Sequence, residues 1–246
     1  MPTNVQSLAV RLNDGEGRFE QASVVATPFA PSAVVKIECG DLDGDGDLDA
    51  ILYLSALFEH TYYVAATNDG TGAFTISSLR VIPILFSLFK LTDLDLDGDL
   101  DMVVSSSYGA TPIQGFVNDG SNTFTPSTLL PASSGTEHGD VPALGDLNND
   151  GRDDIVALWT GRYVYLSTPT GYVESVQPVL QTLNPLVECI ADFNGDGNMD
   201  VLVATVGGTN ALLLGDGTGA LTQAPTPFMT TGTLTTLTPV DIDNDG

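Results

Sequence analysis

Residues 41–49 read DLDGDGDLD, and this acidic pattern returns four more times along the chain. The later copies are 93–101 (DLDLDGDLD), 146–154 (DLNNDGRDD), 192–200 (DFNGDGNMD) and the incomplete 241–246 (DIDNDG). Successive copies start 52, 53, 46 and 49 residues apart, so the chain is built from repeats of about 50 residues. An apolar, β-branched run follows each complete copy directly, which predicts a strand rather than a helix.

A second feature alternates with the acidic loops: a turn rich in Asn, Asp and Gly. Its copies start at Asn13 (NDGEGRF), Asn68 (NDGTGAF), Asn118 (NDGSNTF) and Gly215 (GDGTGAL), with a degenerate copy at Ser167 (STPTGY). Asn, Asp and Gly tolerate positive φ, so these segments predict hairpin turns. Two interleaved features with one period indicate that each repeat is one structural unit.

Each repeat reads as four strands. In the first complete repeat these are Ala33–Glu38, Ala50–Leu54, Thr61–Ala66 and Phe74–Leu79. Equivalent strands follow the later loops at Met102–Val104, Ile155–Leu158 and Val201–Ala204. Four-stranded units that recur every 40–50 residues are typical of propeller blades. A single such sheet cannot bury both faces, whereas stacked blades can. The sequence therefore predicts an all-β fold, a β-propeller of four-stranded blades.

The predicted domain organisation is a single β-propeller domain over residues 1–246, with about five blades' worth of sequence. Its predicted parts are the outer strands of a partial blade (1–32), four blades (33–84, 85–137, 138–185 and 186–232) and the start of a truncated blade (233–246). Two interpretations stay open. The partial blades complete each other in a five-bladed ring, or the chain is a fragment of a larger, seven-bladed propeller.

The bulk composition excludes several function classes. The net charge of −25 argues against nucleic-acid binding and against anionic membrane surfaces. Cys39 and Cys189 are too few for a disulfide scaffold or a cysteine zinc cluster. Both are predicted to be buried free thiols, with a bridge or an exposed thiol as the alternatives. No signal peptide is visible at the start of the sequence. The longest apolar run, 81–89, is too short to span a bilayer and predicts a buried strand.

The acidic loops have the pattern of metal sites, because they hold 20 of the 32 acidic residues. Counted from the first Asp, positions 1, 3, 5 and 9 carry oxygen ligands and position 6 is always Gly. All-oxygen ligand sets favour calcium over zinc, and magnesium prefers to keep its waters. An EF-hand would require Glu at position 12 between helices. Position 12 here is Leu52, Val104, Ala157 or Val203, inside predicted strands.

About four calcium ions are expected, and a fifth only if the last loop is completed. The candidate ligands at positions 1, 3, 5 and 9 are Asp41, Asp43, Asp45 and Asp49; Asp93, Asp95, Asp97 and Asp101; Asp146, Asn148, Asp150 and Asp154; and Asp192, Asn194, Asp196 and Asp200. Position 7 carries Asp47, Asp99, Arg152 and Asn198, and this variation suggests that a backbone carbonyl is the ligand there. The incomplete loop adds Asp241, Asp243 and Asp245.

The acidic loop, the following apolar strand and the NDGTGxF turn together resemble the FG-GAP/VCBS-type repeats of integrin-α-like β-propellers. The resemblance covers essentially the whole chain. It implies structural calcium in the loop between the first and second strands of each blade. It also implies an extracellular or cell-surface protein that acts in adhesion, glycan binding or scaffolding. Arg152, the turn at Ser167 and the incomplete fifth loop depart from the family pattern.

A ligand is expected on the rim opposite the calcium loops, where the loops between second and third strands collect unusual residues. The candidate contacts are His60, Tyr108 and Trp159. No nucleophile elbow, zinc-protease helix or phosphate loop is present in the sequence. The leading hypothesis is a non-enzymatic binding or adhesion module with an unidentified protein or glycan ligand and no membrane insertion. The alternatives are a part of a larger secreted polysaccharide-degrading enzyme, or a structural spacer.

Overall fold

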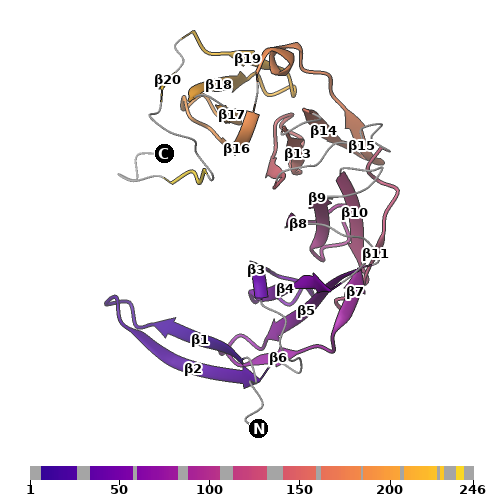
Figure 1. Ribbon diagram of the computed structural model, residues 1–246, viewed down its shortest axis with the longest axis vertical. Coiled ribbons are helices and arrows are strands. Elements are labelled where there is room, and N and C mark those ends of the chain that lie inside the picture. Colours follow the sequence, from indigo (N-terminus) through magenta and orange to yellow (C-terminus); the bar gives the residue numbers. More distant parts are fainter. Residues whose placement is uncertain are drawn as a thin grey trace. The chain divides into compact units, whose positions relative to one another are not determined.

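The computed structural model describes residues 7–26, 34–57, 60–82, 88–105, 113–131, 141–158, 162–183, 185–205, 208–225, 228–229 and 237–240. The chain divides into two compact units. The first consists of Met1–Leu85, Leu96–Asp101 and Val117–Thr125, and the second of Phe86–Asp95, Met102–Phe116 and Pro126–Gly246. Strand follows strand in both units (Figure 1), so the predicted all-β fold is confirmed.

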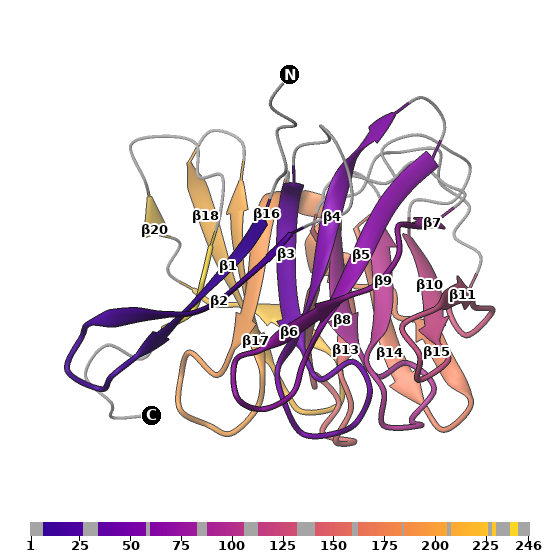
Figure 2. The same cartoon turned by 90° about the horizontal axis from the view of Figure 1, so that it is seen from below.

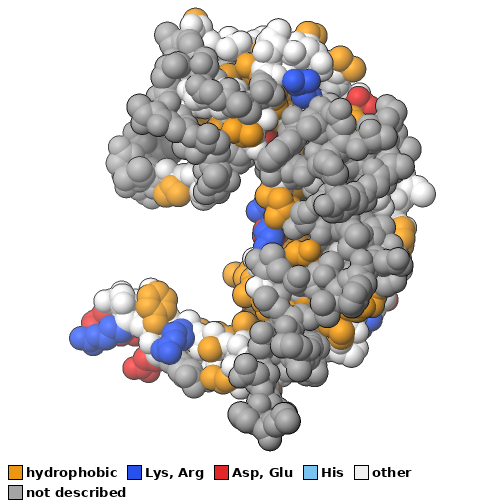
Figure 3. Space-filling view, in the orientation of Figure 1, with side chains coloured by type: hydrophobic (Ala, Val, Ile, Leu, Met, Phe, Trp, Pro, Cys, Tyr) orange, Lys and Arg blue, Asp and Glu red, His pale blue; other side chains and the backbone are white. Residues whose placement is uncertain are grey.

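The first unit begins with a hairpin and continues into a larger antiparallel sheet. The hairpin pairs β1 (Ser7–Asn13) with β2 (Phe19–Ala26). Exposed hydrophobic side chains lie on it, including Leu12, Phe19 and Val24 (Figure 3). The sheet has the order β3-β4-β5-β6, and β7 also pairs with β5. Its strands are β3 (Val34–Gly40), β4 (Asp49–Leu57), β5 (His60–Asn68), β6 (Phe74–Ile76) and β7 (Arg80–Ile82).

The fourth strand of this sheet differs from the single strand predicted over Phe74–Leu79. It consists of two short strands, β6 and β7, that pair with opposite ends of β5. Ser77 interrupts them: its N–H donates to the Ala65 carbonyl (2.8 Å), and its hydroxyl oxygen accepts the Ala65 N–H (3.0 Å). The side chain thus replaces a backbone acceptor, which lets the chain leave the ladder and rejoin it.

The next sheet has the order β11-β10-β9-β8 and contributes residues to both units. Its strands are β8 (Leu88–Thr92), β9 (Asp101–Ser105), β10 (Ile113–Asn118) and β11 (Phe124–Pro126). All five residues of β9 are buried. A strand that is buried on both faces must carry a continuous apolar run, as the MVV segment after Asp101 does.

Two further sheets belong to the second unit. One has the order β12-β13-β14-β15, with strands at Ala143–Gly145, Asp154–Ala157, Tyr163–Thr168 and Gly171–Glu174. The other has the order β16-β17-β18-β19, with β20 also paired to β18. Its strands are β16 (Pro185–Ala191), β17 (Asp200–Thr205), β18 (Thr209–Gly215), β19 (Leu221–Gln223) and β20 (Phe228–Met229). A five-residue 3-10 helix, η1 (Pro178–Thr182), connects the two sheets.

Alternate residues of β13 enter two different hydrophobic clusters. Ile155 and Ala157 pack with Val103 and Ile113, from β9 and β10. Val156, together with Leu158 just after the strand, packs on the other side in a cluster that includes residues of β17 and β18, such as Val201. Side chains of a strand alternate between faces, so both faces of this sheet are covered by neighbouring sheets. This is the packing of propeller blades, and the predicted fold class is confirmed.

Two smaller observations complete the fold. In the described residues no helix is long and apolar enough to cross a membrane. Both cysteines are free, and Cys189 is buried as predicted, but the prediction is wrong for Cys39, which is exposed. Cys39 shares one face of β3 with Ile37, which is also exposed, because alternate residues of a strand point the same way.

Candidate metal centre

Each acidic loop joins the first and second strands of its sheet. The loops are β3–β4, β8–β9, β12–β13 and β16–β17, while the Asn-Asp-Gly turns join the third and fourth strands. In an antiparallel sheet these two connections emerge at the same end, as Figure 2 shows for the β3–β4 loop and the β5–β6 turn. Each acidic loop therefore has a turn of its own sheet as its neighbour.

Backbone conformation explains the glycine at position 6. It has positive φ in all four loops, from +85° at Gly151 to +100° at Gly98. Position 4 also has positive φ, at Gly44, Leu96, Asn149 and Gly195. Left-handed residues at both positions coil the loop tightly, and a Cβ at position 6 would be strained. The short, coiled backbone turns alternate side chains toward one centre.

The position-1 carboxylate is held by the amides of its own loop. Asp41 accepts the N–H groups of Gly44 and Gly46, both at 2.9 Å. Loops 146–154 and 192–200 share the bond from position 6: Asp146 accepts the Gly151 N–H at 2.8 Å, and Asp192 accepts the Gly197 N–H at 2.8 Å. Position 5 is held in the same way, since Asp45, Asp97, Asp150 and Asp196 each accept the N–H of position 7.

The position-9 carboxylates are the first residues of the second strands and are buried: Asp49, Asp101, Asp154 and Asp200 are at most 1% exposed. Two backbone amides clamp this side chain in loops 41–49, 146–154 and 192–200. Asp154, for example, accepts the N–H groups of Leu147 (2.8 Å) and Ser167 (2.6 Å). Desolvation by burial raises the pKa of Asp49, Asp154 and Asp200, and neighbouring carboxylates of the loop add to this effect.

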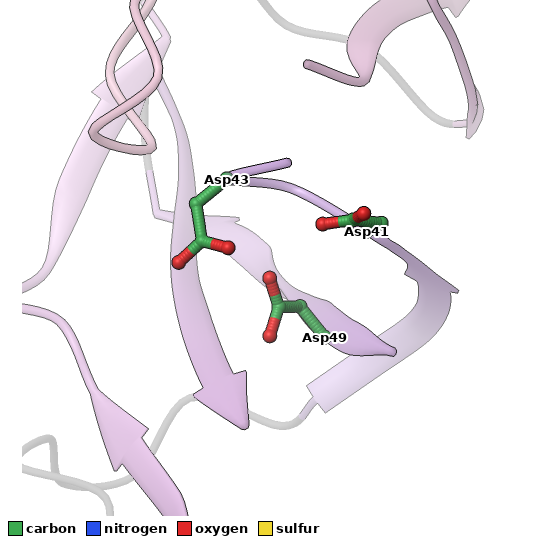
Figure 4. A group of neighbouring side chains, drawn as sticks. All are labelled: Asp41, Asp43 and Asp49. Carbon is green, nitrogen blue, oxygen red and sulfur yellow. The ribbon is translucent and has the colours of Figure 1, made fainter. Parts of the chain in front are cut away.

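Carboxylates of positions 1, 3 and 9 converge in the first two loops. One oxygen from each of Asp41, Asp43 and Asp49 lies within 4.8 Å of the others, and Figure 4 shows the three groups directed toward a common centre. Asp93, Asp95 and Asp101 form the same arrangement within the next loop. Two carboxylates at this separation repel by roughly 3 kcal/mol at an effective dielectric constant of about 20. A divalent cation bound to these oxygens would offset that repulsion.

Position 3 is an amide in the other two loops, and there the side chains form hydrogen bonds within the loop and with the turn. Asn148 Oδ1 accepts the Asp150 N–H (3.0 Å), and Asn148 Nδ2 donates to the Ser167 carbonyl (3.2 Å). Asn194 Nδ2 donates to Asp196 Oδ2 (2.9 Å). Ser167, at the start of the degenerate turn, donates its hydroxyl to Asp150 Oδ2 (2.7 Å). These loops offer fewer charged oxygens at the centre.

The position-7 side chains contact the hairpin turn of their own sheet. A Cβ added at Gly70 would lie 2.5 Å from Asp47 Oδ2, and one added at Gly120 would lie 2.7 Å from Asp99 Oδ2. In the third loop Arg152 Nη1 donates to the Thr168 carbonyl at 2.6 Å. In the fourth, Asn198 contacts Gly217. The loop pattern placed the position-7 residues among the candidate ligands. Their contacts with the turn depend on the tertiary structure and leave no trace in that pattern.

Turn residues are the functional positions that the sequence pattern did not assign. The N–H of Asn68, Asn118, Ser167 or Gly215 donates to the position-9 carboxylate of the same sheet. In the three Asn-Asp-Gly-type turns of these sheets the Asp folds back on the turn, and hydrogen bonds lower the pKa of Asp69, Asp119 and Asp216. The available signal was the regular alternation of loop and turn, with the turn residue 13 to 19 residues after position 9.

Several predicted residues lie outside the described part of the chain. These are Asp241, Asp243 and Asp245 of the incomplete loop, and Tyr108 and Trp159 of the ligand rim. His60 begins β5, but its side chain is not described. Arg162, near the same rim, donates from Nε and Nη2 to the Leu183 carbonyl.

The repeats also match a known family. Residues 93–157 and 192–246 match the sequence model of the FG-GAP-like repeat, so the predicted FG-GAP resemblance is confirmed. No curated protein matches the chain.

Among solved structures, the chain is similar to a chain of the Photorhabdus luminescens Tc holotoxin pore, at 20% identity and a TM-score of 0.39. The match covers 90% of this chain but only 10% of that one. A likeness this weak carries no information on function.

Proposed function

Because the chain contains FG-GAP-like repeats over residues 93–157 and 192–246, we propose that it is a β-propeller binding module whose acidic loops hold structural calcium. The observation that carries the proposal is the convergence of Asp41, Asp43 and Asp49, repeated at the next loop. The donor set fits the ion: every converging group is a carboxylate oxygen, and calcium takes six to eight oxygen ligands. Bound calcium would supply positive charge and cross-link the loop to the first residue of the second strand.

The proposed setting is outside the cell or at its surface, where calcium is abundant at about 1 mM. FG-GAP-like repeats and the strongly acidic charge of the chain support this setting. We propose that the ligand, a protein or a glycan, binds the rim away from the acidic loops. The rim is favoured because loops on a rigid scaffold are free to vary, while the acidic loops are engaged in the sheet contacts described above. Direct calcium titration by calorimetry tests the metal part of the proposal.

The four sites are expected to differ in affinity. Loops 41–49 and 93–101 carry Asp at position 3, whereas Asn148 and Asn194 occupy it in the other two. Carboxylate count tunes calcium affinity, so Asp43→Ala should weaken binding more than Asn148→Ala. The measurement is the melting temperature at limiting calcium, corrected for the change that each substitution causes in EGTA. Four equivalent sites in calorimetry would contradict this expectation.

Trp159→Ala is expected to weaken ligand binding by roughly 2 kcal/mol or more, as loss of an aromatic anchor does. The chain has one Trp, so its fluorescence reports directly on the rim. The matched control is Asp43→Ala in saturating calcium, which should leave ligand affinity unchanged. A glycan array with and without calcium supplies the ligand. If a ligand bound without altering the emission and tolerated Trp159→Ala, the rim would not be the binding surface.

A further inference from the structure

Position 7 of the acidic loops varies in charge, yet the four side chains share one contact. Each lies against the turn of its own sheet, at Gly70, Gly120, Thr168 or Gly217. Where the turn offers a glycine with positive φ, as at Gly217 (+73°), position 7 is a short Asp or Asn. In the third of these sheets Pro169 occupies the place of that glycine. Position 7 is then Arg152, whose side chain is long enough to donate to the neighbouring Thr168 carbonyl. The two departures from the repeat pattern therefore compensate each other.

Two of these side chains, Asp99 and Asn198, also reach position 4 of the preceding acidic loop. In the second unit Asn149 Nδ2 donates to Asn198 Oδ1 at 2.9 Å, and both contact Gly217. In the first unit Asp99 Oδ1 would lie 3.2 Å from a Cβ at Gly44. Position 4 is adjacent to the candidate ligand at position 3, so a side chain bound there restrains the metal loop itself.

A second contact joins position 2 of the same preceding loops to the turn of the following sheet. Asn118 Nδ2 donates to the Leu42 carbonyl at 2.7 Å, and the Gly219 N–H donates to the Leu147 carbonyl at 2.9 Å. Leu42 and Leu147 are fully buried. In both cases the donor belongs to the turn of the following sheet. Each preceding loop is thus contacted by the following sheet on both sides of its position-3 ligand, at position 2 by the turn and at position 4 by the position-7 side chain.

We propose that the position-7 side chain is a clip and not a metal ligand: it joins each metal loop to its own turn, and in two loops it also joins the preceding metal loop, so that calcium loading of these paired loops is coupled. The pairs are 41–49 with 93–101, and 146–154 with 192–200. The coupling rests on the proposed calcium function. Its physical basis is that calcium fixes the coiled conformation of one loop, and the side-chain bond then restricts the conformations open to the other loop.

The test uses Asn149→Gly, Asn198→Ala and the double variant of the full chain. Glycine suits position 4, since Asn149 has a φ of +58° and Gly44 and Gly195 occupy this position in other loops. The control is Thr218→Ala, which removes an exposed hydroxyl that donates to Asp216 within the turn. Calorimetric calcium titration should give the same number of ions as the unsubstituted chain. The affinity of the paired sites should fall about 3- to 10-fold in either single variant, with no further loss in the double variant.

Two results would overturn the clip: loss of one bound ion in Asn198→Ala, which would make Asn198 a ligand, or additive losses in the double variant. An unsubstituted chain that binds no calcium would overturn the proposed function, and the coupling with it. Arg152→Asn adds a metal-independent readout. A cation at a metal site weakens calcium binding, so a ligand role predicts a gain in affinity and no change in EGTA. The clip predicts a lower melting temperature in EGTA, because the Thr168 carbonyl loses its donor; an unchanged value would count against it.

Discussion

Excess EGTA is expected to lower the melting temperature of the protein by more than about 10 °C. If each site has a Kd of about 10–100 μM, about 1 mM calcium adds roughly 1.4–2.7 kcal/mol per site by mass action. Four complete loops then add about 6–11 kcal/mol, comparable with the whole free energy of unfolding of a typical domain. In a chain of 246 residues each kcal/mol shifts the melting temperature by about 2–4 °C, so the loss of all four ions should exceed about 10 °C.

The measurement is thermal unfolding followed by circular dichroism in 1 mM calcium, in EGTA, and in EGTA with calcium restored. The control replaces calcium with magnesium at the same ionic strength, which should restore little of the loss because magnesium dehydrates reluctantly. If chelation left the melting temperature unchanged, the loops would be acidic turns that need no ion. That result would contradict the proposal that they hold structural calcium.

Asp154→Ala is expected to destabilise the protein by about 2–5 kcal/mol even in EGTA. Asp154 is fully buried and accepts the N–H groups of Leu147 and Ser167. Its removal leaves both buried donors without this acceptor, at about 1–3 kcal/mol each. The raised pKa of Asp154 shows that burial of its charge has a cost, which offsets part of this loss. Urea unfolding in EGTA measures the net effect.

Asp43→Ala is the matched comparison, because Asp43 is an exposed member of its loop's carboxylate cluster. In EGTA its removal relieves repulsion from Asp41 and Asp49 and should leave stability unchanged or slightly higher. In calcium it should destabilise through lost metal binding. Asp154→Asn should be intermediate in EGTA, because its Oδ1 can still accept one of the two N–H groups. Equal losses for Asp43→Ala and Asp154→Ala in EGTA would show that position 9 has no structural role beyond the metal.

The repeat, the strand order and the spacing of the acidic positions could be predicted from sequence because they are local. A period of about 50 residues, a glycine at position 6 and an apolar run after each loop depend on the conformational preferences of short segments. The strands after the loops were found where predicted, as at β9 (Asp101–Ser105). The interruption of the fourth strand at Ser77 was not predicted, because a serine that replaces a backbone acceptor has no distinctive sequence pattern.

Tertiary structure decided the roles of individual loop residues. The sequence showed that Asp49 and Asp43 occupy alternate positions of one loop, but not that Asp49 is buried and bonded to backbone amides while Asp43 is exposed. It showed that position 7 varies, but not that Arg152 meets Thr168 or that Asn198 meets Asn149. These facts depend on which segments, up to 49 residues apart, lie side by side.

The sequence by itself determined a repeating all-β fold with acidic loops, because local backbone preference and hydrophobic alternation act within a few residues. Only the packing of the sheets decided which oxygens converge, which are clamped by amides and which loops touch, because burial and hydrogen bonding between distant segments exist only once the chain is folded.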